Sequence, residues 1–73
     1  MDNYKVRWCT LDGEHITDWL SKESAKRNFL RKANEKELKT VWAELLYYDE
    51  DETYIIDRFE RKVVTIMGHD MVV

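Results

Sequence analysis

The chain has 73 residues, of which 44% are hydrophobic, and a formal net charge of −3. This length fits one domain, residues 1–73, and the hydrophobic fraction is too high for a disordered tail. The single cysteine, Cys9, excludes a disulfide-stapled secreted domain, and no apolar run approaches the about 20 residues that cross a bilayer. We therefore expect a folded, cytoplasmic protein without a membrane segment.

The first part of the chain is typical of two strands joined by a turn. Residues 4–10 alternate apolar and polar side chains, with β-branched and aromatic types throughout, which predicts a half-buried strand. The Asp-Gly pair at residues 12–13 is the strongest turn signal in the chain. Residues 15–20 would return as a short second strand, with Ile16 and Trp19 turned inward.

A helix is predicted over residues 22–36. Ser21 is placed to cap it, because a serine hydroxyl can accept a hydrogen bond from the free N–H groups of the first turn. The segment is rich in Ala, Lys, Arg, Leu and Glu, which favour helix. A narrow apolar stripe should pack on one face of a sheet, chiefly through Phe29 and Leu30. The stripe consists of Ala25, Phe29, Leu30 and Ala33.

The second half of the chain reads as a hairpin. The longest predicted strand covers residues 40–48, and residues 53–59 run back beside it after an acidic loop. A possible short fifth strand at residues 63–67 is stopped by Gly68. The order is therefore ββαββ, with a single helix packed on an antiparallel sheet, which is an α+β fold.

The strand at residues 40–48 is apolar on both faces, whereas one helix can cover only one face of a sheet. If Val41, Ala43 and Leu45 lie under the helix, the opposite side chains lie on an open face. A partner, such as a second copy in a homodimer, would cover that face, or residues 63–73 would fold back over it. The predicted self-association residues are Trp42, Leu46 and Tyr48, joined by Trp8 or Phe59.

Charge is sorted by segment. Residues 21–39 hold seven basic residues against three acids, and residues 40–60 hold seven acids against one base. The basic helix can contact nucleic-acid phosphates or an acidic protein surface, or it can simply solvate its outer face, partly paired with Glu23, Glu35 and Glu37. The candidate phosphate-binding residues are Lys22, Lys26, Arg27, Arg31, Lys32 and Lys36.

The acidic residues follow the predicted hairpin and would line one end and one edge of the sheet. Carboxylates spaced along a strand pair can occupy phosphate positions on a DNA-binding protein and so displace DNA. The alternative is an exposed charged hairpin that protects the sheet edge from aggregation. The candidate partner-binding residues are Glu44, Asp49, Glu50, Asp51, Glu52, Asp57 and Glu60.

No residue pattern predicts catalysis or a cofactor. Cys9, His15 and His69 match no zinc spacing, and the two glycines form no phosphate-binding loop. The acidic loop lacks the glycine and the distal glutamate of a calcium-binding EF-hand. We therefore expect a non-enzymatic protein that holds no metal and no cofactor.

The segment TVWAELLYYDEDETYIIDRFE, which follows YKVRWCTLDG and a basic helix, resembles the short, highly charged α+β proteins that tailed bacteriophages encode. Several proteins of that kind bind and inhibit host replication, nucleoid or transcription proteins, some by imitating the charge of DNA. The resemblance lies in size, charge blocks, aromatic strands and the absence of proline, so no functional residue is carried over. It implies an inhibitor or regulator that acts in the host cytoplasm on a host protein with a basic surface. The alternative is a nucleic-acid-binding domain that uses the basic helix.

Overall fold

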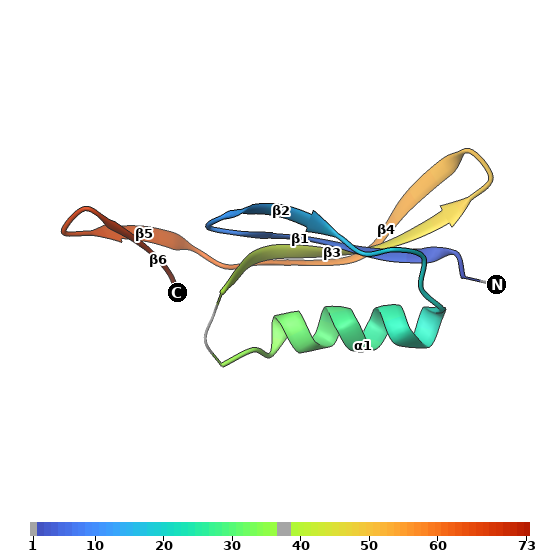
Figure 1. The fold of residues 1–73 in the computed structure, drawn as a ribbon, viewed down its shortest axis with the longest axis horizontal. Helices are drawn as coiled ribbons and strands as arrows, with labels where there is room; N and C mark the ends of the chain where they lie inside the picture. The colour runs from blue at the N-terminus through green and yellow to red at the C-terminus, as the bar shows by residue number, and fades with distance from the viewer. Residues whose placement is uncertain (1, 37–38) are drawn as a thin grey trace.

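A computed structural model describes residues 2–36 and 39–73 of the chain. The described residues form two strands, one helix and then four strands (Figure 1). Their bounds are β1 Tyr4–Thr10, β2 Gly13–Ile16, α1 Lys22–Ala33, β3 Thr40–Asp49, β4 Glu52–Glu60, β5 Val63–Ile66 and β6 His69–Val72.

Four of the strands form one antiparallel sheet in the order β2-β1-β3-β4. The predicted α+β class, with one helix on an antiparallel sheet, is confirmed, as is the succession ββαββ of the first five elements. The first turn also falls where it was predicted, since Thr10 pairs with Gly13 across the loop of residues 11–12. Gly13 has a φ of 135°, a conformation that side-chain-bearing residues rarely adopt.

The helix α1 begins at its predicted cap and ends earlier than expected. The Ser21 hydroxyl accepts a hydrogen bond from the backbone N–H of Ser24 at 3.2 Å, which satisfies one free donor of the first turn. The helix ends at Ala33 because Asn34 turns its side chain back on the helix and donates from Nδ2 to the Leu30 carbonyl at 2.9 Å. A side chain that bonds its own backbone in this way competes with further helix.

The hydrophobic core lies between α1 and the strands β1 and β3. Ala43 and Leu45 are buried under the helix, as predicted, and they pack with three further buried side chains. Trp8 and Phe59 lie on this same side of the sheet, not on the open face, because each stands opposite Ala43 in its strand pairing. Residues that stand opposite each other share a face. Among the described residues, the buried members of this core cluster are Val6, Ala25, Phe29, Ala43 and Leu45.

The helix presents Phe29 to the core and leaves Leu30 exposed at the rim, so the prediction that Leu30 packs in the core was wrong. Phe29 is buried, and its ring lies 5.6 Å from that of Phe59, whereas Leu30 is 54% exposed. Consecutive helical residues point about 100° apart, so Leu30 lies at the margin of the helix–sheet contact, where it borders a hollow with Leu45 and Ile56. The inward orientation expected for Ile16 and Trp19 was wrong too, since both are exposed. Ile16 stands opposite Arg7 at the sheet edge, on the face that the helix does not cover.

The helix covers only part of the sheet. It packs on β1 and β3, and the edge strand β4 extends beyond it (Figure 1). Every residue of β4 from Glu52 to Arg58 is exposed. The far end of the β3–β4 hairpin rises away from the rest of the sheet (Figure 1).

The last two strands form a hairpin of their own, which we call the arm (residues 63–73). Its strands β5 and β6 make a separate two-stranded sheet, so the predicted fifth strand exists but does not join the main sheet. The arm also does not fold back over the open face, because it projects beyond the end of the sheet (Figure 1). The molecule is consequently elongated, with extents of 47 × 23 × 17 Å.

Candidate functional site

The open face of the sheet is organised around the buried carboxylate of Glu44. Arg7 donates to its Oε1 from Nη2 at 2.5 Å, and Arg58 donates to its Oε2 from Nη1 at 2.7 Å. The Glu44 side chain is only 4% exposed. Sequence analysis placed Glu44 in the acidic partner-binding set, but both of its oxygens are engaged within the sheet, which leaves it no free surface to offer.

Two guanidinium groups flank the ring of Trp42, which is half-buried. The guanidinium carbons (Cζ) of Arg7 and Arg58 lie 5.7 and 5.1 Å from the ring centroid, within reach of a cation–π interaction. Leu46, predicted to be an exposed self-association residue, is buried at 3% exposure. Arginine and lysine can spread their apolar stems over a sheet while their charges stay in water. The open face is thus more polar than the alternation of apolar residues predicts.

The third predicted self-association residue, Tyr48, is half-buried at the end of this face. The ring of Trp19 meets it edge-on, with centroids 4.8 Å apart. The ammonium of Lys5 lies 4.3 Å from the Trp19 centroid, so this end of the face also carries a cation over its aromatic rings. The three predicted residues therefore do not form one continuous exposed patch.

The acidic residues of the β3–β4 hairpin separate into engaged and free groups. Glu60 binds Arg58, and the Asp57 carboxylate accepts the Arg58 backbone N–H at 2.8 Å. Glu52 accepts the hydroxyl of Tyr54. At the turn, by contrast, three exposed acids make no side-chain hydrogen bond or ion pair to the described residues. These acids, which we call the acidic turn, are Asp49, Glu50 and Asp51.

Tyr54 reports on the charge near this turn. Its hydrogen bond to Glu52, more than any other influence, raises the pKa of Tyr54, with Asp49 adding to the shift. The neutral phenol donates this bond, and the phenolate would be repelled by the carboxylate. We therefore expect Tyr54 to ionise at a higher pH than an ordinary tyrosine in an NMR titration, and Glu52→Gln to lower its midpoint. An unchanged midpoint in that variant would mean that the contact does not exist in solution.

The basic helix keeps most of its charge unneutralised. Lys32 differs from the others because it is half-buried, with its ammonium 4.0 Å from the Trp8 centroid and donating to Asn28 at 2.6 Å. Burial, helped by neighbouring Arg31, lowers the pKa of Lys32. The other predicted phosphate-binding residues are exposed and form no ion pair with the described residues. These residues, which we call the basic face, are Lys22, Lys26, Arg27, Arg31 and Lys36.

The acids expected to neutralise the helix form no ion pair with its side chains among the described residues. Glu35 binds Arg61 and accepts the backbone N–H of Thr40, and Glu23 makes no ion pair with the described residues. Glu37 lies outside the described residues. Within the described residues, the partial neutralisation considered from the sequence is limited to the charge of Glu35, which acts on Lys32 and opposes the lowering of its pKa.

Arg61 is a central residue that sequence analysis missed. It donates to the carbonyls of Lys32, Ala33 and Thr40 at 2.8–3.0 Å, so it ties the end of α1 to the start of β3. No sequence signal distinguishes it from the neighbouring Lys62. Only the fold brings the end of β4 against the last turn of the helix.

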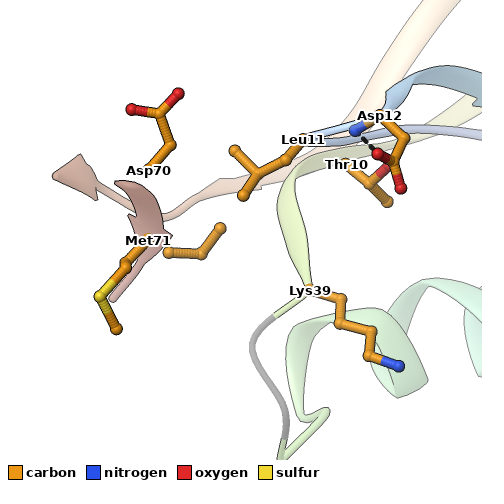
Figure 2. A pocket seen from close by; sticks show the side chains of 7 residues that line it. Thr10, Leu11, Asp12, Lys39, Asp70 and Met71 are labelled. Atoms are coloured by element: carbon orange, nitrogen blue, oxygen red, sulfur yellow. Dashed lines mark hydrogen bonds between the residues drawn. The ribbon is translucent and has the colours of Figure 1, made fainter. Parts of the chain in front are cut away.

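A hollow of about 500 Å³ separates the arm from the β1–β2 turn (Figure 2). Leu11 from the turn and Met71 from the arm border it, with Asp12 and Asp70 among its polar side chains. Asp12 is held by the Thr10 hydroxyl, which accepts its backbone N–H at 3.2 Å. Among the described residues, no three His, Cys, Asp or Glu side chains are grouped closely enough to hold a metal ion.

Comparison with protein-family models, with curated proteins and with solved structures gives no match to this chain. No helix in residues 2–36 and 39–73 has the length and apolar character needed to span a membrane. The class of this protein therefore rests on its own fold, which is a small α+β domain with separate acidic and basic surfaces.

Proposed function

We propose that this chain is a protein-binding module that engages a basic surface of its partner through the β3–β4 hairpin. The observation that carries the proposal is the continuity of the acidic turn with the exposed strand β4. Tyr54, Ile55 and Ile56 of that strand are all exposed, although they are large and apolar. Charge around an apolar contact is the usual anatomy of a protein interface, because charge speeds association and apolar burial holds the complex.

The resemblance to phage proteins suggests the kind of partner. A host protein that binds DNA has a basic surface for phosphates, and the carboxylates of the acidic turn would occupy some of those phosphate positions. The module would then act as an inhibitor or regulator by competition with DNA and would catalyse no reaction. The burial of Glu44 reduces the set of carboxylates that can take part to those at the turn and along β4.

The test compares two variants in the capture of a partner from a lysate of the source cells. Asp49→Asn, Glu50→Gln and Asp51→Asn together neutralise the acidic turn, and the control, Arg27→Gln with Arg31→Gln, changes the basic face. We expect the hairpin variant to associate several-fold more slowly with the captured partner and to lose salt dependence. Normal binding by the hairpin variant, with loss in the control, would overturn the proposal.

A second candidate, nucleic-acid binding, is favoured by the basic face. Its five cations lack intramolecular ion pairs among the described residues, so they are available to phosphates. A gel shift with single- and double-stranded DNA at low salt separates the two functions. Binding that weakens steeply with salt and is lost with Arg27→Gln and Arg31→Gln would support the second candidate.

A further inference from the structure

The arm is an apolar hairpin with little support from the rest of the molecule. Its strands β5 and β6 pair with each other and pack on no other helix or strand to a comparable extent. The radius of gyration is 13.5 Å, against about 11 Å for a compact chain of this length, because the arm projects from the sheet. An isolated two-stranded hairpin is at best marginally stable in water, so the arm needs a further strand or a covering surface.

The side chains of the arm also indicate that it is covered. Val63, Ile66 and Met71 are exposed, and Met67 at the tip is 94% exposed. Met67 adopts a φ of 52°, a left-handed conformation that favours glycine or asparagine. Selection for solubility alone would not place a large apolar side chain in a strained, exposed turn. Met67 is therefore a candidate contact residue.

The strand edges of this molecule are not equally protected against pairing. The edge strand β4 carries charged residues and a register irregularity, both of which discourage a further strand. The short edge strand β2 carries Glu14 and His15. By contrast, β5 has the sequence VVTI, with no charged residue at all. Its partner β6 borders the hollow against the β1–β2 turn, so the free edge of β5 is the more accessible one.

We propose that the arm joins two copies of this chain by antiparallel pairing of β5 with β5 of the second copy. A two-fold axis near Val64 or Thr65 places only uncharged side chains opposite one another within residues 63–66. β-Branched cross-strand pairs of this kind stabilise antiparallel sheets. The two arms then form a four-stranded sheet, which exceeds the minimum that an independently stable sheet requires.

This dimer differs from the one that sequence analysis predicted through Trp42, Leu46 and Tyr48. The arm lies at one end of the molecule and the tip of the β3–β4 hairpin at the other (Figure 1). Pairing through the arms therefore leaves the acidic turns of both copies free at the outer ends. A dimer of this form could engage two sites at once, which raises the effective affinity without any new contact.

The test uses disulfide crosslinking of the full chain in a Cys9→Ser background. A residue on the two-fold axis of an antiparallel pair lies about 4.5–5.5 Å from its own copy between Cα atoms, a distance that a disulfide can span. We expect Val64→Cys or Thr65→Cys to form a covalent dimer on mild oxidation. The matched control is Thr53→Cys on the exposed strand β4, which should remain monomeric on a denaturing gel.

Light scattering provides a measurement that needs no cysteine. The unmodified chain should have the mass of a dimer at micromolar concentration, Val64→Lys that of a monomer, and the control Thr53→Lys that of a dimer. Circular dichroism checks that all three chains remain folded. A monomeric unmodified chain, or a dimer that survives Val64→Lys, would overturn the proposal.

Discussion

Replacing Arg61 with alanine is expected to lower the free energy of unfolding by about 3 kcal/mol, since a hydrogen bond to a charged group contributes about 1.5–3 kcal/mol. The Arg61 side chain is only 10% exposed, and it donates to carbonyls at the end of α1 and at Thr40. Its removal leaves these carbonyls without their donor. A domain of this size has a stability of roughly 5 kcal/mol, so the loss should appear as a large shift of the urea midpoint.

Two further variants show whether the loss of stability in Arg61→Ala comes from the geometry of the guanidinium or from its charge. Lys62→Ala removes the same charge from the neighbouring, exposed position and should change stability by less than about 0.5 kcal/mol. Arg61→Lys keeps the charge, but a single ammonium cannot reproduce the planar fork of the guanidinium. It should therefore recover only a minor part of the loss. Equal effects of Arg61→Ala and Lys62→Ala would contradict the role assigned to Arg61.

The second large effect is expected at Phe29, where alanine should cost about 3–5 kcal/mol because it leaves a cavity in the core. Phe29 is buried between the helix and the sheet and meets the ring of Phe59. A core of five buried residues has little capacity to fill the space that the missing ring leaves. Urea unfolding of the variant, followed by tryptophan fluorescence, measures the change.

Leu30→Ala is the matched control, since it removes an apolar side chain from the adjacent position on the same helix. The exposed position of Leu30 predicts a cost below about 1 kcal/mol, because truncation there leaves no closed cavity. The two variants together determine the rotation of the helix on the sheet. A larger effect at Leu30 than at Phe29 would mean that the Leu30 side of α1, and not the Phe29 side, packs against the core.

Much of the fold could be predicted from local patterns. The alternation within residues 4–10, the run of mostly apolar residues at 40–48 and the Asp-Gly turn are each patterns of residues near one another in the sequence. The Ser21 cap is another, and the structure confirms all four features. The separation of basic and acidic charge likewise follows directly from the order of residues. The sequence therefore determined the class of fold and the two charged surfaces.

The tertiary structure decided which of these residues remain free. Arg7, Glu44 and Arg58 are distant in the sequence, and only the register of β1, β3 and β4 makes them neighbours. That register removes Glu44 from the candidate surface and places cations over Trp42. The pairing of β5 with β6 could not be predicted from local patterns either, because it depends on the direction that the chain takes after β4. There the long-range contacts of Arg61 with α1 hold the chain as the arm leaves the sheet, and no local propensity encodes such contacts.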